Sequence, residues 1–293
     1  MITYTVTDTQ LSSIADSIRS KAGVYGSLIF PGGFISAVNY CYSTADLPAF
    51  DFVTTDTNWS NLTSYIASSA YKGGSVKAVY FPICTDIRQY AFQSCALRYA
   101  GFPNCENISP IAFEMCRSLT TVSFPKCITI GGAAFNGCWS LGEVNFPVCT
   151  SVGGSAFGGC GALSRAVFPK CTTISPMAFA WCSALSSIHF PKCTYIGGYA
   201  FYCCYSLSTA SFPKCTTIGS AAFSACTRLV SLYLNGVSSV PTLGEDAFNA
   251  TPIGGYTIAT AGQYGSVFVP SSLYTSFLTA TNWSSISARI VSV

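Results

Sequence analysis

The 293-residue chain is 50% hydrophobic and only 9% charged, and its 14 basic and 11 acidic residues leave a net charge of +3. A charge this small and scattered excludes a nucleic-acid-binding surface, and the apolar residues occur in groups too short for a membrane-spanning helix. The polar, threonine-rich residues 1–10 also lack the basic start and the apolar stretch of a secretory signal peptide.

Residues 1–40 are predicted to form a small helical unit. Thr7 and Gln10 fit a capping box, and apolar residues follow at helical spacing between positions 11 and 18. A second short helix is expected after the Phe-Pro-Gly-Gly segment at residues 30–33.

Residues 76–234 contain seven repeats of 22 residues, and residues 41–75, which carry few charges and several aromatic side chains, are expected to cap their open end. Each repeat has one Phe-Pro pair, one Ala-Phe pair and two cysteines. The cysteines of this ladder stand at positions 84, 95, 105, 116, 127, 138, 149, 160, 171, 182, 193, 204, 215 and 226. They are 11 residues apart except between Cys95 and Cys105, where the shorter interval predicts a shortened loop.

The repeat length and its leucine-type spacing are the signature of a leucine-rich-repeat solenoid. The pattern is seen in Leu119-x-x-Val122-x-Phe124, which is predicted to form a short strand that proline then ends. Ile130 and Phe135 are expected to point inward from the return path of the same coil. Each coil therefore closes around its own apolar centre.

Residues 235–293 are predicted to form an irregular last repeat and a C-terminal cap. Ala247-Phe248 continues the repeat after the cysteine period lapses, and a strand at 267–270 and a helix at 271–279 close the end. The predicted fold is thus a leucine-rich-repeat solenoid of mostly short parallel strands and loops, with a small helical N-terminal unit and a C-terminal strand-helix cap.

The motif Ile-Gly-x-x-Ala-Phe-x-x-Cys-x-x-Leu-x-x-Val-x-Phe-Pro, as in residues 130–147, resembles the BspA-like leucine-rich-repeat family of bacterial surface proteins. The resemblance covers about residues 76–293 and implies the solenoid fold while leaving the function open. The second cysteine, as in Phe124-Pro125-Lys126-Cys127, departs from many members, which carry an aliphatic residue or serine there.

A second resemblance concerns the N-terminal unit. Residues 11–38, with Ile-Ala-Asp-Ser-Ile-Arg-Ser-Lys and Phe-Pro-Gly-Gly-Phe, resemble a short segment of tail-region proteins of phages and prophages of gut Firmicutes. This resemblance implies that the N-terminal unit attaches the chain to a virion.

The 16 cysteines are compatible with a metal site, with disulfides or with free buried thiols. Metal sites need ligands that converge on one point, whereas an 11-residue ladder places each thiol at the same place in successive coils. Disulfides between coils would distort the strand stacking. We therefore expect free, buried thiols and no metal, with Cys203 and Cys41 as the most exposed and reactive cysteines.

No catalytic residue and no cofactor are predicted, so the protein is not expected to be an enzyme. His189 occupies an outward strand position without a Ser/Asp or Cys/Asn constellation. Glu143 and Arg165 occupy matching positions of adjacent coils and are expected to form an exposed ion pair, which contributes little to stability. The Gly153-Gly154 pair lies in repeat phase and lacks the context of a phosphate-binding loop.

Two outer surfaces are candidate binding sites. The outward row of the strand face, expected to be concave, contains Tyr80, Tyr99, Glu143, Asn145, Arg165, His189 and Tyr233. A loop row around the second cysteine contains Trp139, Trp181, Tyr199, Tyr202 and Tyr205. Tyr and Trp among Ser, Gly and Asn are typical of recognition surfaces, although such side chains can also pack sideways over neighbouring loops.

These features favour a non-enzymatic ligand-binding or adhesion protein. The expected partner is a host-surface protein or glycan, and the N-terminal unit is expected to join a virion or a cell-surface assembly. We therefore expect the protein on a virion or an extracellular surface, as the host-recognition protein of a phage or prophage. The alternatives are a bacterial cell-surface adhesin whose signal has been removed and a purely structural spacer.

Overall fold

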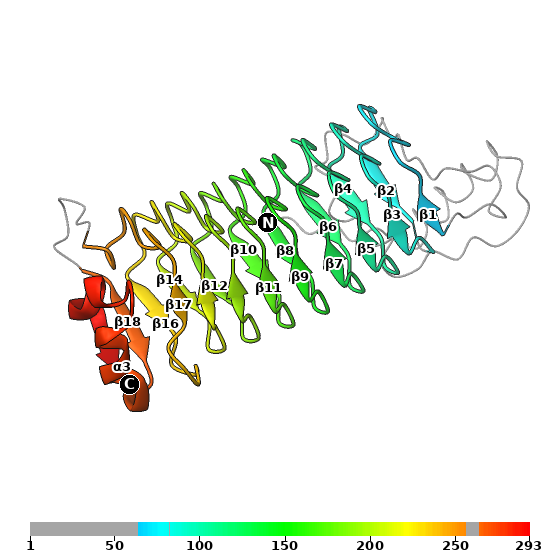
Figure 1. Ribbon diagram of the computed structural model, residues 1–293. Helices are drawn as coiled ribbons and strands as arrows, with labels where there is room; N and C mark the ends of the chain where they lie inside the picture. The colour runs from blue at the N-terminus through cyan, green and yellow to red at the C-terminus, as the bar shows by residue number, and fades with distance from the viewer. Residues whose placement is uncertain (1–63, 82, 256–263) are drawn as a thin grey trace, which may run out of the picture.

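The repeat forms one coil of a parallel β-solenoid, and successive coils stack along a single axis (Figure 1). The computed structural model describes residues 64–81, 83–255 and 264–293. The helices predicted within residues 1–40 and most of the predicted cap at 41–75 lie outside the described residues.

One face of the solenoid consists of the predicted Leu-x-x-Val-x-Phe strands, which are parallel. They are β2 (Ala78–Tyr80), β4 (Tyr99–Gly101), β6 (Thr121–Ser123), β8 (Glu143–Asn145), β10 (Arg165–Val167), β12 (Ser187–His189), β14 (Thr209–Ser211), β16 (Ser231–Tyr233) and β18 (Ser266–Val269). Central residues such as Val79, Val144 and Ile188 are buried, because alternate side chains of a strand point to opposite faces. The residues on either side of each central residue therefore form the outer strand face.

A second face is built from two-residue strands where the sequence predicted only an irregular return path. These are β1 (Tyr65–Ile66), β3 (Asp86–Ile87), β5 (Asn107–Ile108), β7 (Thr129–Ile130), β9 (Ser151–Val152), β11 (Thr173–Ile174), β13 (Tyr195–Ile196), β15 (Thr217–Ile218) and β17 (Thr242–Leu243), and together they form one nine-stranded parallel sheet. Two residues are too few for an alternating pattern to be recognised, although the buried branched residue of each pair suits a strand.

A turn that contains residues in the left-handed backbone conformation leads each coil from the second face back to the first. Ser155 and Gly159 have φ angles of 53° and 70°, and they flank Phe157 in the turn. The amide N–H groups of these three residues donate to carbonyl oxygens of the next coil at 3.0, 2.8 and 2.8 Å. The turns therefore form a hydrogen-bonded ladder of their own. We call this strip the turn edge and define it as residues 90–96, 111–117, 133–139, 155–161, 177–183, 199–205 and 221–227.

Two columns of phenylalanine rings fill the core. Rings of the Ala-Phe pairs stack face to face, as do Phe135 and Phe157 at 5.3 Å between centroids, and rings of the Phe-Pro pairs stack likewise, as do Phe102 and Phe124 at 5.2 Å. The two columns meet edge-on, as Phe157 and Phe168 do at 5.9 Å and 68°. Both arrangements are favoured by the charge distribution of aromatic rings, so the core has one regular packing along its length.

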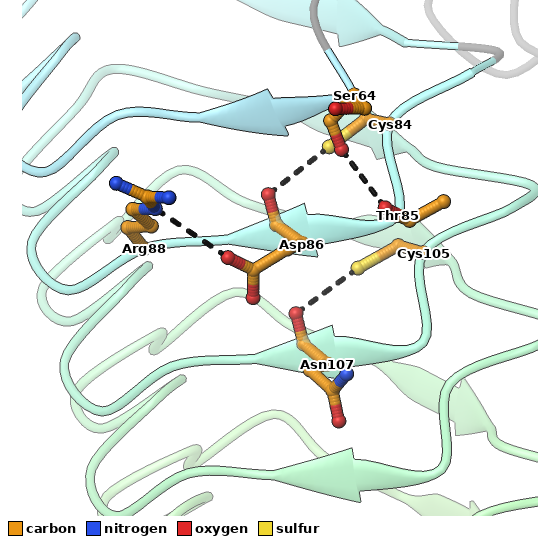
Figure 2. A network of polar contacts seen from close by, with 7 residues as sticks. All are labelled: Ser64, Cys84, Thr85, Asp86, Arg88, Cys105 and Asn107. Carbon is orange, nitrogen blue, oxygen red and sulfur yellow. Dashed lines mark hydrogen bonds and ion pairs between the residues drawn. The ribbon is translucent and has the colours of Figure 1, made fainter.

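The cysteines form two ladders of free, buried thiols, which confirms the prediction for the described residues. In the first ladder each thiol donates to the carbonyl oxygen two residues later, as Cys84 does to Asp86 and Cys105 to Asn107, both at 3.3 Å (Figure 2). In the second ladder each thiol donates across coils, as Cys160 does to the carbonyl oxygen of Phe135 at 3.2 Å. Cysteine thus acts as a small apolar residue that still supplies a weak donor.

The short cysteine interval shortens one turn without breaking the coil, as predicted. Strand β4 pairs in register with both β2 and β6. One residue separates Cys95 from Leu97, whereas two separate Cys116 from Leu119. The deletion is therefore confined to the turn edge.

The stack of coils begins earlier than the predicted first repeat at residue 76. Strand β1 pairs with β3, and the ring of Tyr71 stacks on Phe92 at 5.0 Å. Ala70 and Tyr71 stand at the Ala-Phe position, four residues after Ile66. The pattern was hidden because this coil has tyrosine for phenylalanine and lacks the cysteine.

The predicted strand and helix close the C-terminal end (Figure 1). Strand β18 is followed by η2 (Ser271–Leu273), α3 (Tyr274–Thr279), η3 (Ser284–Arg289) and an unpredicted last strand, β19 (Ile290–Ser292), which pairs with β18. Trp283 is fully buried, packs against Phe248 and Phe277, and donates its indole N–H to the carbonyl oxygen of Pro241 at 2.7 Å. Among the described residues, no helix is long and apolar enough to cross a membrane.

Candidate binding surface

All five candidates of the predicted loop row lie on the turn edge. Trp139 is 52% exposed, and Trp181, Tyr199 and Tyr205 are between 45% and 47% exposed, while Tyr202 is half-buried. Large aromatic side chains this exposed leave much apolar surface in contact with water.

Four of these side chains come from two adjacent coils and lie together. The Tyr202 ring meets Trp181 edge-on at 5.2 Å and Tyr199 edge-on at 5.7 Å. A hydrogen bond with the Cys203 thiol raises the pKa of both Tyr202 and Tyr205. We call Trp181, Tyr199, Tyr202 and Tyr205 the aromatic cluster.

The structure corrects the prediction that Cys203 is an exposed, reactive thiol. Cys203 is only 5% exposed, and its thiol is hydrogen-bonded with Tyr202 and Tyr205. The neighbouring aromatic side chains cover a position that the repeat phase alone places at the surface. Cys203 therefore belongs to the base of the aromatic cluster.

Two of the aromatic candidates stand where the backbone favours glycine. Trp181 and Tyr199 have φ angles of 60° and 58°, and a side chain in this left-handed region costs on the order of 1–2 kcal/mol. The sequence signalled this strain only at the position of Trp181, where the two preceding coils have Gly137 and Gly159; the position of Tyr199 is occupied by Ser155 and Met177 in the two preceding coils. Since strained residues persist only where surrounding structure holds them, we infer that the ladder of turn hydrogen bonds keeps the backbone of these residues in place.

Trp139 forms a separate aromatic site on the same edge. The guanidinium of Arg117, one coil earlier, lies 4.3 Å from the centre of the Trp139 ring. This cation–π contact covers one face of the indole and holds its orientation.

The ends of the strand face are covered, which corrects the prediction for Tyr99. Tyr99 is only 6% exposed, because Gly101 has no side chain and the Tyr99 hydroxyl lies directly over it. Tyr80 packs against Tyr99 and is half-buried. At the other end, Tyr233 is half-buried and stacks on Phe268 at 4.7 Å.

The middle of the strand face is exposed and polar. Glu143 and Arg165 pair across β8 and β10 at 3.9 Å, as predicted, with both side chains about two-thirds exposed. Asn145 and His189 are exposed, and the partner of His189 in the next coil is Ser211 rather than a carboxylate. This face therefore offers scattered polar groups and no gathered constellation.

Within the described part of the chain, no three His, Cys, Asp or Glu side chains lie together in a way that could hold a metal ion. Burial raises the pKa of the Cys149 and Cys160 thiols to about 12 and that of Cys171 to about 11. Such thiols carry no thiolate at neutral pH, and the thiolate is the reactive form.

We expect the native protein to react with a thiol reagent at no more than one cysteine per chain at neutral pH. The chain has 16 cysteines, and all 15 within the described residues are buried, which leaves Cys41. The measurement is the number of thiols modified by an aromatic disulfide reagent before and after unfolding in urea. A Cys41→Ser variant is the control, and modification of two or more thiols in the folded protein would contradict the burial of the ladders.

Comparisons with known proteins agree with the repeat seen in the structure. A family model described as "BspA type Leucine rich repeat region" matches residues 39–164 and 150–264, with six copies. A search of curated proteins found no match.

Three solved structures are similar to this chain. A T. pallidum leucine-rich-repeat protein has 26% identity and a TM-score of 0.47, and the match covers 59% of this chain and 75% of that one. A leucine-rich cell surface protein from Faecalibacterium prausnitzii A2-165 has 24% identity and a TM-score of 0.46, and the match covers 64% of this chain and 62% of that one. A leucine-rich-repeat protein from Bacteroides ovatus ATCC 8483 has 15% identity and a TM-score of 0.40, and the match covers 78% of this chain and 87% of that one. Since the family model matches most of the sequence, the chain belongs to the BspA-type leucine-rich-repeat family.

Proposed function

We propose that the protein is a non-enzymatic adhesion protein that binds a partner on a host surface through the aromatic cluster. The observation that carries this proposal is the gathering of Trp181, Tyr199 and Tyr205, each nearly half exposed, around the half-buried Tyr202. Tyrosine and tryptophan supply large contact areas at a low cost in conformational entropy.

A purely structural role explains this cluster poorly. Packing over neighbouring loops would bury these rings, whereas Trp181, Tyr199 and Tyr205 are each nearly half exposed. The hydrogen-bonded turn ladder beneath the cluster holds its backbone in place before any partner binds, and such preorganisation lowers the entropic cost of association.

The carrier in this proposal is a phage or prophage particle, to which the N-terminal unit would attach. Its support is the resemblance of residues 11–38 to tail-region proteins. A bacterial cell surface is the alternative carrier, in keeping with the BspA-type family. Immunodetection in purified phage particles and in washed cell envelopes distinguishes the two carriers.

Replacing the aromatic cluster should abolish binding to host cells without unfolding the protein. The variant combines Trp181→Gly, Tyr199→Gly, Tyr202→Ala and Tyr205→Ser, and the two glycines suit the left-handed backbone. We expect at least about a tenfold weaker binding to a panel of gut bacteria, because the anchors of an interface carry most of its energy. The measurement is cell-bound fluorescent protein as a function of concentration, with the melting temperature as a check on folding.

A matched variant of the strand face serves as the control. It combines Glu143→Gln, Arg165→Gln and His189→Gln, and it should bind as the unmodified protein does. Loss of binding in this variant alone would place the site on the strand face. If the unmodified protein binds no cell of the panel, the adhesion function is rejected in favour of the spacer.

A further inference from the structure

The second half of the solenoid carries positive charge without compensation. No aspartate or glutamate occurs between Glu143 and Glu245, and the structure describes every residue of this stretch. The same stretch contains five basic side chains besides its histidine, which are Arg165, Lys170, Lys192, Lys214 and Arg228. The small net charge of the whole chain therefore conceals a local positive field that attracts anions.

Three of these side chains form a row along one corner of the solenoid. Lys170, Lys192 and Lys214 each follow a Phe-Pro pair, where a coil passes from the strand face to the second face. All three lysines are exposed. The phenylalanine rings that precede them stack at 5.8 and 5.6 Å between centroids, so the lysines are attached at about the same spacing. We call this row the lysine corner.

The ammonium groups of the lysine corner are free. Lys126, two coils before the row, has the same phase but donates to the side-chain oxygen of Asn104 at 2.7 Å. Within the described part of the chain, the three lysines of the row make no hydrogen bond and no ion pair. Val148 and Gly236 occupy the same position in the coils on either side, so the row is three coils long.

A structural role explains this row poorly. Like charges on neighbouring strands destabilise a sheet. Lysines do protect open strand edges from aggregation, but β11, β13 and β15, which follow the three lysines, are each paired on both sides. The corner has no open strand edge to protect, and its repulsion is relieved only when an anion binds.

A row of threonine hydroxyls runs beside the lysines. Thr172, Thr194 and Thr216 are exposed and stand two residues after each lysine, with a buried cysteine between. Their hydroxyls donate to carbonyl oxygens of the preceding coil at 3.1, 3.2 and 2.9 Å. Each hydroxyl oxygen keeps lone pairs that can accept from a ligand. The corner therefore repeats one cation and one acceptor in every coil.

This arrangement suits a linear polymer with one negative charge and several hydroxyl groups on each unit. Lysine binds an anion as a point charge, without the planar two-point geometry that arginine selects. One sugar of an extended polysaccharide chain is about as long as one coil is thick, so successive sugars can meet successive coils.

We propose that the lysine corner binds an acidic polysaccharide with one carboxylate on each sugar. Three charged sugars lie across the coils of Lys170, Lys192 and Lys214, with their carboxylates near the ammonium groups and their hydroxyls donating to the threonines. The second face separates this corner from the turn edge. The inference therefore goes beyond the proposed function and does not depend on the aromatic cluster.

Other polyanions fit the corner less well. A lipid surface is contacted over an area and held by inserted apolar side chains, whereas these lysines form a line beside threonines. A single nucleic-acid strand needs aromatic side chains on which its bases stack. In residues 166–174, 188–196 and 210–218, all of which the structure describes, Tyr195 is the one exposed tyrosine, tryptophan or phenylalanine.

The test removes the charges of the row and keeps its shape. The row variant carries Lys170→Gln, Lys192→Gln and Lys214→Gln, and its melting temperature should not fall, because repulsion between like charges is removed. The matched control removes the same charge from three exposed lysines elsewhere, with Lys72→Gln, Lys77→Gln and Lys126→Gln.

Titration calorimetry at low and at high salt measures the binding of four probes. They are hexamers of galacturonate and of mannuronate, the fully methyl-esterified galacturonate hexamer, an oligothymidylate, and vesicles of phosphatidylglycerol. The methyl ester keeps the sugar chain and removes its charge. The variant of the aromatic cluster is titrated alongside, because it should bind acidic hexamers as the unmodified protein does.

We expect at least one acidic hexamer to bind, more weakly at high salt, and the methyl ester not to bind. The row variant should weaken this binding at least about tenfold, equivalent to about 1.4 kcal/mol, and the control should leave it unchanged. The proposal is overturned if neither acidic hexamer binds, if the methyl ester binds equally well, or if the row variant binds normally. Tighter binding of oligothymidylate or of the vesicles would equally reject it in favour of a nucleic acid or a membrane.

Discussion

Above about pH 9 the solenoid is expected to lose stability steeply. In 13 of the described cysteines burial raises the pKa of the thiol above its ordinary value of 9.0. The pKa rises to about 11 for Cys84 and to about 12 for Cys116 and Cys215. The cause is the loss of water around the thiolate, which the core cannot replace.

The sign follows from which state binds more protons. At a pH between the pKa of a thiol in the unfolded chain and its higher pKa in the folded chain, the folded chain keeps this thiol protonated while the unfolded chain ionises it. The stability contributed by these groups is therefore complete below about pH 9 and is lost as the pH rises toward the folded-state values. Each thiol lowers the free energy of unfolding by about 1.4 kcal/mol per pH unit above its unfolded pKa, so that about ten such groups together match the roughly 5–15 kcal/mol that is typical of a folded domain.

Urea unfolding under reducing conditions at about pH 7.5, 9 and 10 measures this effect. The urea concentration at the midpoint of unfolding should fall sharply between the two higher pH values. Ultraviolet absorbance should show thiolate appearing together with the loss of the circular dichroism signal of the strands. The 17 tyrosines of the chain provide an internal control, because tyrosinate has its own absorbance and most exposed phenols ionise without unfolding. If unfolding follows the tyrosinate signal, or if the midpoint is independent of pH, the buried thiols are not the cause.

Phe157→Ala should cost about 3–5 kcal/mol of stability, as expected for removing a fully buried phenylalanine. The Phe157 ring stacks on Phe135 and Phe179 and meets Phe146 and Phe168 edge-on. The neighbouring coils cannot collapse into the cavity, because their hydrogen bonds fix the distance between them. Since each coil contacts only its neighbours, a weak point in the middle also divides the solenoid into two halves.

Phe248→Ala at the end of the same column is the positional control. Phe248 stacks on Phe223 on one side and meets Trp283 on the other, so its loss should loosen the cap and leave the preceding coils joined. Chemical unfolding should remain one transition in Phe248→Ala and become broader, with a smaller slope, in Phe157→Ala. A cost below about 1 kcal/mol for Phe157→Ala would contradict a close-packed column.

The coil itself could be predicted because its residues repeat. Phenylalanine, isoleucine and cysteine recur in phase, and each is buried where the phase places it, as Ile130 and Phe135 show. The early coil at Ile66 was missed since Tyr71 replaces phenylalanine there. The two-residue strands were missed because their alternation is too short to recognise.

The surface was harder to predict, because exposure depends on what neighbouring coils contribute. Tyr99 is covered since Gly101, two residues later on the same strand, leaves room for the ring. Cys203 is covered by tyrosines beside it in sequence. Repeat phase gives the direction of a side chain, whereas its accessibility is set by the sizes of the side chains around it. The binding role of the loop row remains a prediction for the same reason.

The backbone of the turn edge is held by hydrogen bonds between backbone groups of successive coils, as those of Phe157 and Trp181 show, so exposed aromatic side chains of this edge can change without altering the fold. A binding specificity carried there can diversify by single substitutions in one coil at a time. Duplication or loss of a whole coil would move an aromatic site along the axis by one repeat, about the 5.3 Å between stacked rings, and leave the core in register. The turn edge is accordingly a place where recombination between repeats can produce new ligand preferences, and a suitable scaffold for grafting them by design.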